Sequence, residues 1–203
     1  MSTFPETYLS VVVPLQSGAA APDLPGYIDQ VFTLFSSRFE HIELLLIDDH
    51  GEFHERASVL LQQYPCLRYV QLTRPQPIEI AITAGFDLAI GDIVVVLPLG
   101  TGLGEYLDTM IENALARDVL VIGDTTSPPR PRLHRLCRTV FFWTARRLLN
   151  FDLCHTGGHV MALSRSTLNT IGSVKDKLRY VKAIASVSGA RVELVRPTEP
   201  VLE

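Results

Sequence analysis

The stretch Ile93-Val94-Val95-Val96-Leu97-Pro98-Leu99-Gly100 (residues 93–100) decides the fold. Residues 93–97 are all apolar and mostly β-branched, which favours a strand buried on both faces, as in a parallel sheet. Apolar residues at helical spacing precede this strand over Ile78–Ile90 and follow it from about Glu105 to Arg117. A buried strand between two helices is typical of a βαβ unit. We therefore predict a mostly parallel central sheet with residues 93–97 in its interior and helices on both faces.

The same alternation of short β-branched runs and longer amphipathic stretches extends in both directions from this strand. Further strands are expected over Tyr8–Pro14, Ile42–Asp48, Leu67–Leu72, Val119–Gly123, Val160–Leu163 and Arg191–Arg196. Further helices are expected over Leu24–Phe39, Glu52–Tyr64, Arg132–Leu149, near Ser166 and over Lys177–Ser188. This order predicts a single α/β domain over residues 1–203.

Composition excludes several classes of protein. The chain has 203 residues, a net charge of −4 and a pI of about 5.9, so it has no general attraction to nucleic acid. The three cysteines, Cys66, Cys137 and Cys154, lie far apart without CxxC spacing, which is typical of reduced thiols in a cytosolic protein. No apolar run is long enough to span a membrane, and no secretion signal begins the chain. We therefore expect a cytoplasmic protein that does not bind nucleic acid.

In open parallel α/β sheets, ligands bind beyond the carboxyl ends of the strands, where loops and helix N-termini offer free backbone donors. Three predicted strand ends are therefore candidates for a binding site. They are Pro14-Leu15-Gln16, Ile47-Asp48-Asp49-His50-Gly51 and Leu97-Pro98-Leu99-Gly100.

Motifs at these strand ends, in this order, resemble those of the family-2 glycosyltransferases. Ser10–Pro14 is similar to the family's Ser-Val-Val-Ile-Pro strand end, and Ile47–Gly51 to its Val-Asp-Asp-Gly-Ser turn. The resemblance covers about residues 8–196 and is nearest to the polyprenyl-phosphate (dolichyl-phosphate mannose-type) sugar synthases. The other stretches that carry it are Gln71–Arg74, Ala84–Phe86, Ala89–Val94, Arg135–Leu149 and Gly157–Arg165.

This resemblance implies a single GT-A-type, Rossmann-like domain that transfers a sugar from a nucleotide-sugar donor to a lipid-phosphate or glycan acceptor. Residues 1–124 would form the nucleotide-binding half and residues 125–203 the acceptor-side half. The nucleotide would lie against five residues of the first two strand ends, which are Pro14, Leu15, Gln16, Asp48 and Asp49. An alternative for the two aspartates is that a strand-terminal Asp caps the following turn.

The third strand end departs from the family pattern. Family members carry Asp-x-Asp there, and its carboxylates hold Mn²⁺ or Mg²⁺ against the diphosphate. Pro98-Leu99-Gly100 offers no side chain that ligates a hard cation. Asp92 begins the strand at its other end, where a cap or turn contact is expected. The amides of Gly100, Gly102 and Gly104 could cradle a diphosphate without metal, or could simply form a tight turn.

On the acceptor side, the candidates for a catalytic base are Asp124 and Asp152, although both could be simple loop carboxylates. No Asp or Glu occurs from Thr125 to Phe151, and arginines are frequent there. This basic, amphipathic segment is typical of a helix that binds a polyprenyl-phosphate or the anionic inner face of a membrane, although it could also be the solvated face of an ordinary helix. The four arginines that we assign to this acceptor or membrane contact are Arg130, Arg132, Arg135 and Arg138.

Three functional hypotheses follow from these observations. The first is a transferase that works without the usual metal site, with impaired activity. The second is a non-catalytic binding or scaffold module of a glycan-assembly system. The third, an NAD-dependent enzyme, is disfavoured because Pro14–Gly18 lacks the GxGxxG turn of such proteins.

Overall fold

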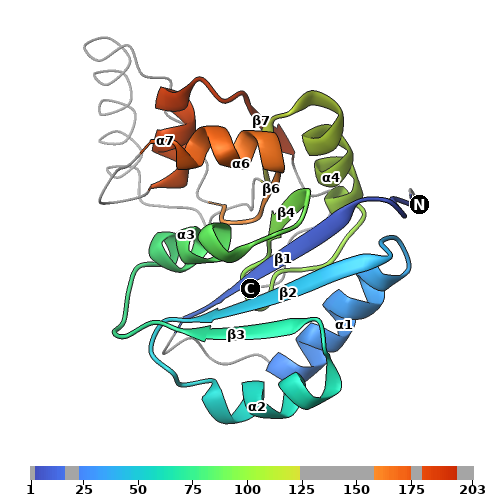
Figure 1. The fold of residues 1–203 in the computed structure, drawn as a ribbon, viewed down its shortest axis with the longest axis vertical. Coiled ribbons are helices and arrows are strands. Elements are labelled where there is room, and N and C mark those ends of the chain that lie inside the picture. The colour runs from blue at the N-terminus through green and yellow to red at the C-terminus, as the bar shows by residue number, and fades with distance from the viewer. Residues whose placement is uncertain (1–2, 17–22, 124–157, 175–179, 196–203) are drawn as a thin grey trace, which may run out of the picture.

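The computed structural model describes residues 3–16, 23–123, 158–174 and 180–195, and Figure 1 shows its arrangement. The expectations that fall on Asp124, Asp152, the arginine-rich segment and the helix over Arg132–Leu149 lie outside the described residues. Within the described residues, seven strands form one sheet in the order β3-β2-β1-β4-β6-β5-β7. The strands are β1 (Tyr8–Leu15), β2 (His41–Asp48), β3 (Leu67–Gln71), β4 (Ile93–Val96), β5 (Leu120–Gly123), β6 (Met161–Ser164) and β7 (Val192–Val195).

The sheet is mostly parallel, as predicted. Strands β1 to β4 run in one direction, and β6 pairs antiparallel with both β4 and β5. Strand β7 pairs parallel with β5. The predicted central strand is confirmed, because β4 is the fourth of the seven strands and all of its residues are buried.

Helices cover both faces of the sheet, as Figure 1 shows. They are α1 (Leu24–Ser36), α2 (His54–Gln63), α3 (Ile78–Leu88), α4 (Tyr106–Arg117), α6 (Arg165–Gly172) and α7 (Val181–Ser188). Side chains alternate between the faces along β4: Ile93 and Val95 lie in one core with residues of α1, α2 and α4. Val94 and Val96 lie in the other core, with residues of α3, α6 and α7. Fully burying one such side chain contributes about 1.5–3 kcal/mol, so β4 stabilises both layers.

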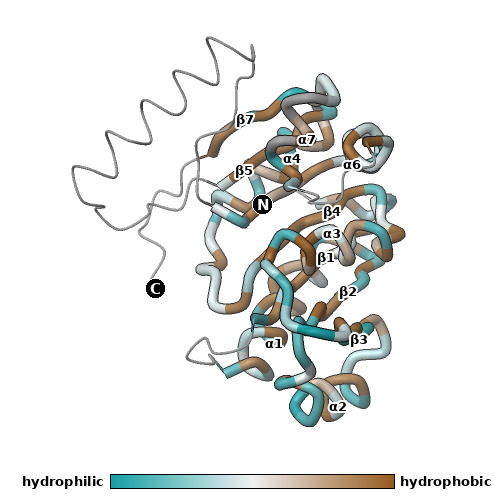
Figure 2. The backbone as a smooth tube through the Cα atoms, turned by 90° about the vertical axis from the view of Figure 1, so that its left-hand side faces the viewer, coloured by the Kyte–Doolittle hydropathy of each residue, from teal (hydrophilic) through white to brown (hydrophobic). Residues whose placement is uncertain are grey.

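Hydropathy follows this layered arrangement. Figure 2 shows hydrophobic residues along the central strands and more hydrophilic ones along β3, which lies at an edge of the sheet. Strand β3 is correspondingly only partly buried beyond Leu67. An edge strand with exposed polar residues is less prone to pair with another chain.

The predicted element ends differ from the observed ones by a few residues. The largest difference within the described residues is at the end of α1, which we predicted to reach Phe39 and which ends at Ser36. Phe39 is nevertheless 3% exposed and packs in the core with Phe35. Hydrophobic spacing reports which residues are buried, whereas a helix end is set by backbone hydrogen bonds, so the two need not coincide.

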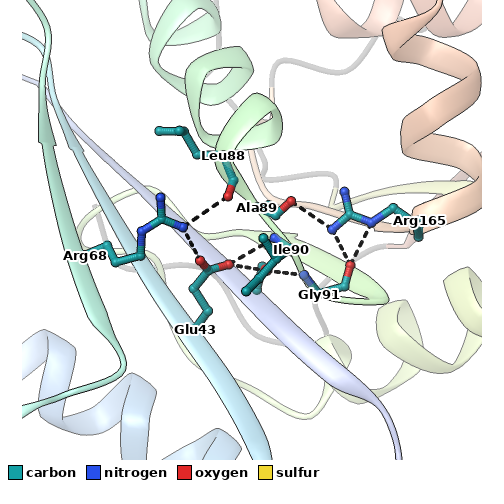
Figure 3. A network of polar contacts seen from close by, with 8 residues as sticks. Glu43, Arg68, Leu88, Ala89, Ile90, Gly91 and Arg165 are labelled. Carbon is teal, nitrogen blue, oxygen red and sulfur yellow. Dashed lines mark hydrogen bonds and ion pairs between the residues drawn. The ribbon is translucent and has the colours of Figure 1, made fainter.

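A buried polar network joins the amino-terminal ends of the strands, the edge opposite the predicted site (Figure 3). The Glu43 carboxylate accepts hydrogen bonds from the Ser10 hydroxyl at 2.7 Å and from Arg68. The Ser10 hydroxyl in turn accepts from the Gly91 amide at 2.8 Å. Arg165, at the start of α6, donates to the Gly91 carbonyl, so this network connects β1, β2 and β3 with α6 and with Gly91, two residues before β4.

Asp92 lies at this same edge and makes the turn contact that we expected. Its carboxylate accepts from the Tyr8 amide at 2.9 Å, and its own amide donates to the Tyr8 carbonyl at 2.7 Å. Asp92 therefore fixes the beginning of β4 beside β1 and lies away from the candidate site.

Candidate functional site

The carboxyl ends of β1, β2 and β4 meet at one edge of the sheet. Leu15 is the register partner of Asp48, and the Asp49 amide donates to the Leu15 carbonyl at 3.2 Å. On the other side of β1, the Leu97 amide donates to the Val12 carbonyl at 2.9 Å. The three predicted strand ends are therefore neighbours, as a shared cleft requires.

Asp48 is wholly buried and its carboxylate serves the turn that follows β2. One oxygen accepts from the amides of His50 and Gly51 at 3.0 and 2.8 Å. The other accepts from the Phe53 amide at 2.9 Å and from the Tyr69 hydroxyl at 2.7 Å. Burial raises the pKa of Asp48, but these four hydrogen bonds outweigh it, so the pKa lies below its ordinary value. These contacts correspond to the capping alternative for this aspartate.

The residues after Asp48 carry the polar groups that border the open edge. Asp49 is 5% exposed, whereas His50 and Gln16 are exposed. Gly51 adopts a left-handed φ of +88°, and the Gln71 side-chain amide lies directly over it, only 2.3 Å from where a β-carbon would be. The turn thus brings Gln71, at the end of β3, next to the end of β2. Sequence reasoning quoted Gln71 only within the stretch Gln71–Arg74 and did not assign it to the site, although its place at a strand end was a signal.

The turn after β4 is fixed by hydrogen bonds to its backbone. The Pro98 carbonyl accepts from the Tyr27 hydroxyl at 3.1 Å and from the Thr101 amide at 3.0 Å. Gly100 has a φ of +83°, a left-handed conformation that glycine adopts without strain. Burial is the main reason why the pKa of Tyr27 is raised, so its hydroxyl stays protonated and continues to donate.

A divalent cation does not fit this turn. No side chain of Pro98, Leu99 or Gly100 is a ligand for a hard cation, and the Pro98 carbonyl already accepts two hydrogen bonds. Across the described ranges, no group of three or more His, Cys, Asp or Glu side chains is placed to hold a metal ion. We therefore assign no step to a metal.

The glycine-rich loop leads into α4. The Tyr106 hydroxyl donates to the Gly102 carbonyl at 2.7 Å, and burial raises the pKa of Tyr106 to about 12. The Gly104 carbonyl accepts from the Leu107 amide at 3.1 Å. These contacts define an ordered turn, in which Gly102 and Gly104 are exposed to solvent. Whether its amides receive a phosphate stays a prediction.

A second polar cluster lies at the same edge, before β6, and sequence reasoning missed it. The Lys182 ammonium, from the first turn of α7, donates to the Gly158 carbonyl at 2.5 Å. His159 follows Gly158, and its Nδ1 is shielded from solvent without a hydrogen-bond partner. Burial and the charge of Lys182 lower the pKa of His159, and Glu79 opposes this effect. The available sequence signal was a glycine pair followed directly by a histidine before a strand.

No protein-family model and no curated protein sequence matches the chain. Solved structures do resemble it in fold. A crystal structure of a mycobacterial protein matches with a TM-score of 0.63 and 18% sequence identity, covering 94% of this chain and 66% of that one. A mannosyltransferase from Pyrobaculum calidifontis in complex with GDP-Man and Mn²⁺ matches with a TM-score of 0.64 and 16% identity, covering 99% and 59%. This chain therefore spans two thirds or less of the length of these two structures.

These likenesses show the fold class. The chain has an α/β, Rossmann-like fold similar to that of this mannosyltransferase, and its described residues form a mostly parallel seven-stranded sheet. At 16% and 18% identity the likeness concerns the fold alone. Among the described helices, none has the length and apolar character needed to cross a membrane.

Proposed function

We propose that this chain binds a nucleotide-sugar at the shared carboxyl edge of β1, β2 and β4, and that it does so without a divalent cation. The observation that carries the proposal is the convergence of these three strand ends in a fold shared with a mannosyltransferase. Ligands of open α/β sheets bind at such an edge because backbone donors and loop side chains converge there. The absence of ligating side chains at Pro98–Gly100 supports the metal-independent form of the proposal.

The nucleotide would contact the first two strand ends. Because the Asp48 carboxylate already accepts four hydrogen bonds, its part in the site is to hold the turn in place. The direct contacts would come from Asp49 and from the exposed side chains Gln16 and Gln71, whose amides can both donate to and accept from a base or a ribose. Pro14 and Leu15 would provide the floor of the pocket.

The diphosphate would lie towards Gly100, Gly102 and Gly104. Without a bound cation, the negative charges of the diphosphate would be repelled by the carboxylates of Asp48 and Asp49. Only backbone amides and distant cations would offset this repulsion. We therefore expect weak binding and slow sugar transfer. The acceptor would be a lipid phosphate or a glycan.

The acceptor side of the proposal rests on sequence alone. An anionic acceptor or membrane surface would be contacted by Arg130, Arg132, Arg135 and Arg138. Each cation near that surface would contribute about 1 kcal/mol of binding free energy. Asp124 and Asp152 remain candidates for a catalytic base. Binding to vesicles with anionic lipid that added salt does not weaken would contradict the arginine assignment.

A second candidate function is a non-catalytic module that keeps the fold for binding or scaffolding in a glycan-assembly system. The observation that favours it is the same turn after β4, which lacks the side chains that would hold a metal against the leaving diphosphate. The two candidates agree on nucleotide-sugar binding and differ on turnover.

Calorimetric titration with GDP-mannose and UDP-glucose, each with and without Mn²⁺, tests the proposal. We expect a dissociation constant in the high micromolar range or weaker, which corresponds to a binding free energy of roughly −5 kcal/mol. Adding Mn²⁺ should not change this binding. Asp49→Asn and Gln71→Ala should each weaken it, whereas Gln62→Ala, on the exposed surface of α2, should leave it unchanged. Strong Mn²⁺ dependence would show that other residues supply a metal site, and no binding to either nucleotide-sugar would refute the proposal.

A further inference from the structure

The cluster of Gly158, His159 and Lys182 has no role in the nucleotide contacts described above, yet it lies at the same edge of the sheet. The antiparallel register of β4 and β6 pairs Val96 with Met161. Pro98 lies two residues after Val96, and His159 lies two residues before Met161, at the same end of this strand pair. His159 therefore precedes β6 at the carboxyl end of β4, the edge of the sheet that the diphosphate would approach.

The face of the sheet on which His159 lies follows from the alternation along β6. Val160 belongs to the core shared with α1 and α4, and Met161 to the core shared with α3 and α7. His159 therefore falls on the α3 and α7 side. The charged residues that act on it electrostatically, Lys182 in the first turn of α7 and Glu79 in the first turn of α3, come from those same two helices.

The environment of His159 gives it two properties of a general base, an imidazole nitrogen without a hydrogen-bond partner and a lowered pKa. Its Nδ1 is shielded from water and no residue of the described chain hydrogen-bonds to it, which is costly for a polar atom unless a ligand satisfies it. Its pKa lies below the ordinary value of about 6.5, chiefly because of burial, so the imidazole is neutral at pH 7 and can accept a proton. Lys182 is 3% exposed and its ammonium fixes the Gly158 carbonyl, which orients the backbone that carries His159.

We propose that His159 accepts the proton of the hydroxyl group that attacks the donor sugar, and that Lys182 is its positioning residue. In this step the acceptor O–H bond breaks and its proton passes to the imidazole. The acceptor oxygen bonds to the anomeric carbon, and the bond from that carbon to the phosphate oxygen breaks, its electron pair leaving with the nucleoside diphosphate. The inference rests on the proposed function and narrows its acceptor to a hydroxyl, because an anionic phosphate acceptor would need no base.

The test measures release of nucleoside diphosphate from GDP-mannose and from UDP-glucose by the full chain between pH 5 and pH 9, with water or an added glycan as acceptor. The wild-type rate should fall on the acid side at the pKa of His159, determined independently by NMR titration of its imidazole. His159→Asn should lower the rate by about 100-fold or more and abolish the acid limb, since a general base contributes about 10²–10⁴. The affinity for the nucleotide-sugar, measured by calorimetry, should change by less than about twofold, since a base is not a donor-binding group.

Two further variants separate positioning from folding. Lys182→Met should lower the rate and move the acid limb to higher pH, because removing the nearby cation raises the pKa of His159. Lys182→Arg should largely restore both. His41→Asn, which changes an exposed histidine at the opposite edge of the sheet, should change neither.

The outcomes distinguish failure of the role proposed for His159 from failure of the proposed nucleotide-sugar binding. Nucleotide-sugar binding with an unchanged rate in His159→Asn would overturn this inference alone, and so would binding to the wild type with no release of nucleoside diphosphate. A wild-type acid limb that does not coincide with the imidazole titration would overturn it even if the variants do not fold. Absence of nucleotide-sugar binding would instead refute the proposed function on which the inference rests.

Discussion

At the scale of single residues, Asp48 fixes the turn after β2 through its buried carboxylate. Its carboxylate accepts four hydrogen bonds from the turn after β2 and from Tyr69 in β3. Hydrogen bonds to a charged group each contribute about 1.5–3 kcal/mol, and the burial of the carboxylate makes their loss more costly. The position of Asp49 and His50 at the open edge therefore depends on Asp48.

Replacing Asp48 by Asn should lower the free energy of unfolding at pH 7 by about 2–4 kcal/mol, because one carboxylate oxygen becomes an NH₂ group that cannot accept. The pKa of Asp48 is depressed in the folded state, so its contribution is present above the unfolded pKa, about 3.9, and is lost as pH falls through the folded pKa. The difference between wild type and variant should therefore shrink below about pH 4. Urea unfolding at pH 7 and pH 3 measures this.

The control for Asp48→Asn is Glu55→Gln, which removes a similar charge from an exposed side chain of α2. Its effect should stay within about 0.5 kcal/mol. A change in Asp48→Asn as small as that of the control would mean that the four hydrogen bonds contribute nothing net.

The sequence predicted where the aspartate pair lies but left its role open. An Asp at a strand end can cap a turn or bind a ligand, and the choice depends on where the following amides point. That direction depends on the left-handed φ of Gly51, a backbone property that the sequence allows but does not determine. His159 was missed for a related reason: its importance comes from Lys182 and Glu79, which are distant from it along the chain and come close only in the folded sheet.

At the scale of elements, the strands and helices of the first half were predictable because burial follows a regular period. The all-apolar run of β4 has no polar face, so it had to lie between two layers. The place of β6 between β4 and β5, and its antiparallel direction, were not predictable in the same way, because they depend on pairing between distant segments.

The junction between α3 and β4 makes a prediction at this scale. A β-carbon at Gly91 would lie 2.6 Å from the Ser10 amide nitrogen and 2.7 Å from the Tyr8 carbonyl oxygen, both backbone atoms that cannot rotate away. Gly91→Ala should therefore lower the free energy of unfolding by about 1–3 kcal/mol or more, as overpacking of a core does. Chemical denaturation measures the loss, and hydrogen exchange should show faster opening of β1 and β4.

Gly172→Ala is the matched control, because a β-carbon there has no atom within 4 Å and Gly172 ends α6. It should be neutral or stabilise by up to about 1 kcal/mol, the helix preference of Ala over Gly. Equal effects of the two substitutions would show that the close approach at Gly91 does not affect the free energy of unfolding.

At the scale of the whole molecule, the two ends of the strands form edges of different character. The amino-terminal edge is closed by the Glu43 network, in which the buried Glu43 carboxylate accepts from the Ser10 hydroxyl and from the partly exposed Arg68. The carboxyl edge leaves polar groups at its surface, among them Gln16, His50 and Gln71. A sheet that is fixed at its amino-terminal edge and leaves polar groups at its carboxyl edge suits a binding site, because ligand contacts then need little reorganisation of the sheet.

The proposal that the turn after β4 decides whether this edge can use a metal is tested on the intact protein by introducing two carboxylates there. Replacing Pro98 and Gly100 together by Asp should introduce Mn²⁺-dependent binding of GDP-mannose, at least about tenfold tighter with the ion, or roughly 1.4 kcal/mol. The hydrogen bonds from Tyr27 and Thr101 reach the backbone carbonyl of residue 98, so they do not require the proline ring. The left-handed φ of +83° at Gly100 will strain its replacement, although Asp tolerates that region better than most residues.

The control places the second carboxylate at Gly102 instead, so that Pro98→Asp with Gly102→Asp adds the same charge without the Asp-x-Asp spacing. Gly102 is exposed and is not among the described glycines with positive φ, so this variant should fold without that strain. It should repel the diphosphate and gain no Mn²⁺ dependence, because it lacks the Asp-x-Asp spacing. Calorimetry with and without Mn²⁺ on both variants measures the difference. Equal responses to Mn²⁺ would mean that added negative charge alone attracts the ion, and that the geometry of the turn after β4 does not select it.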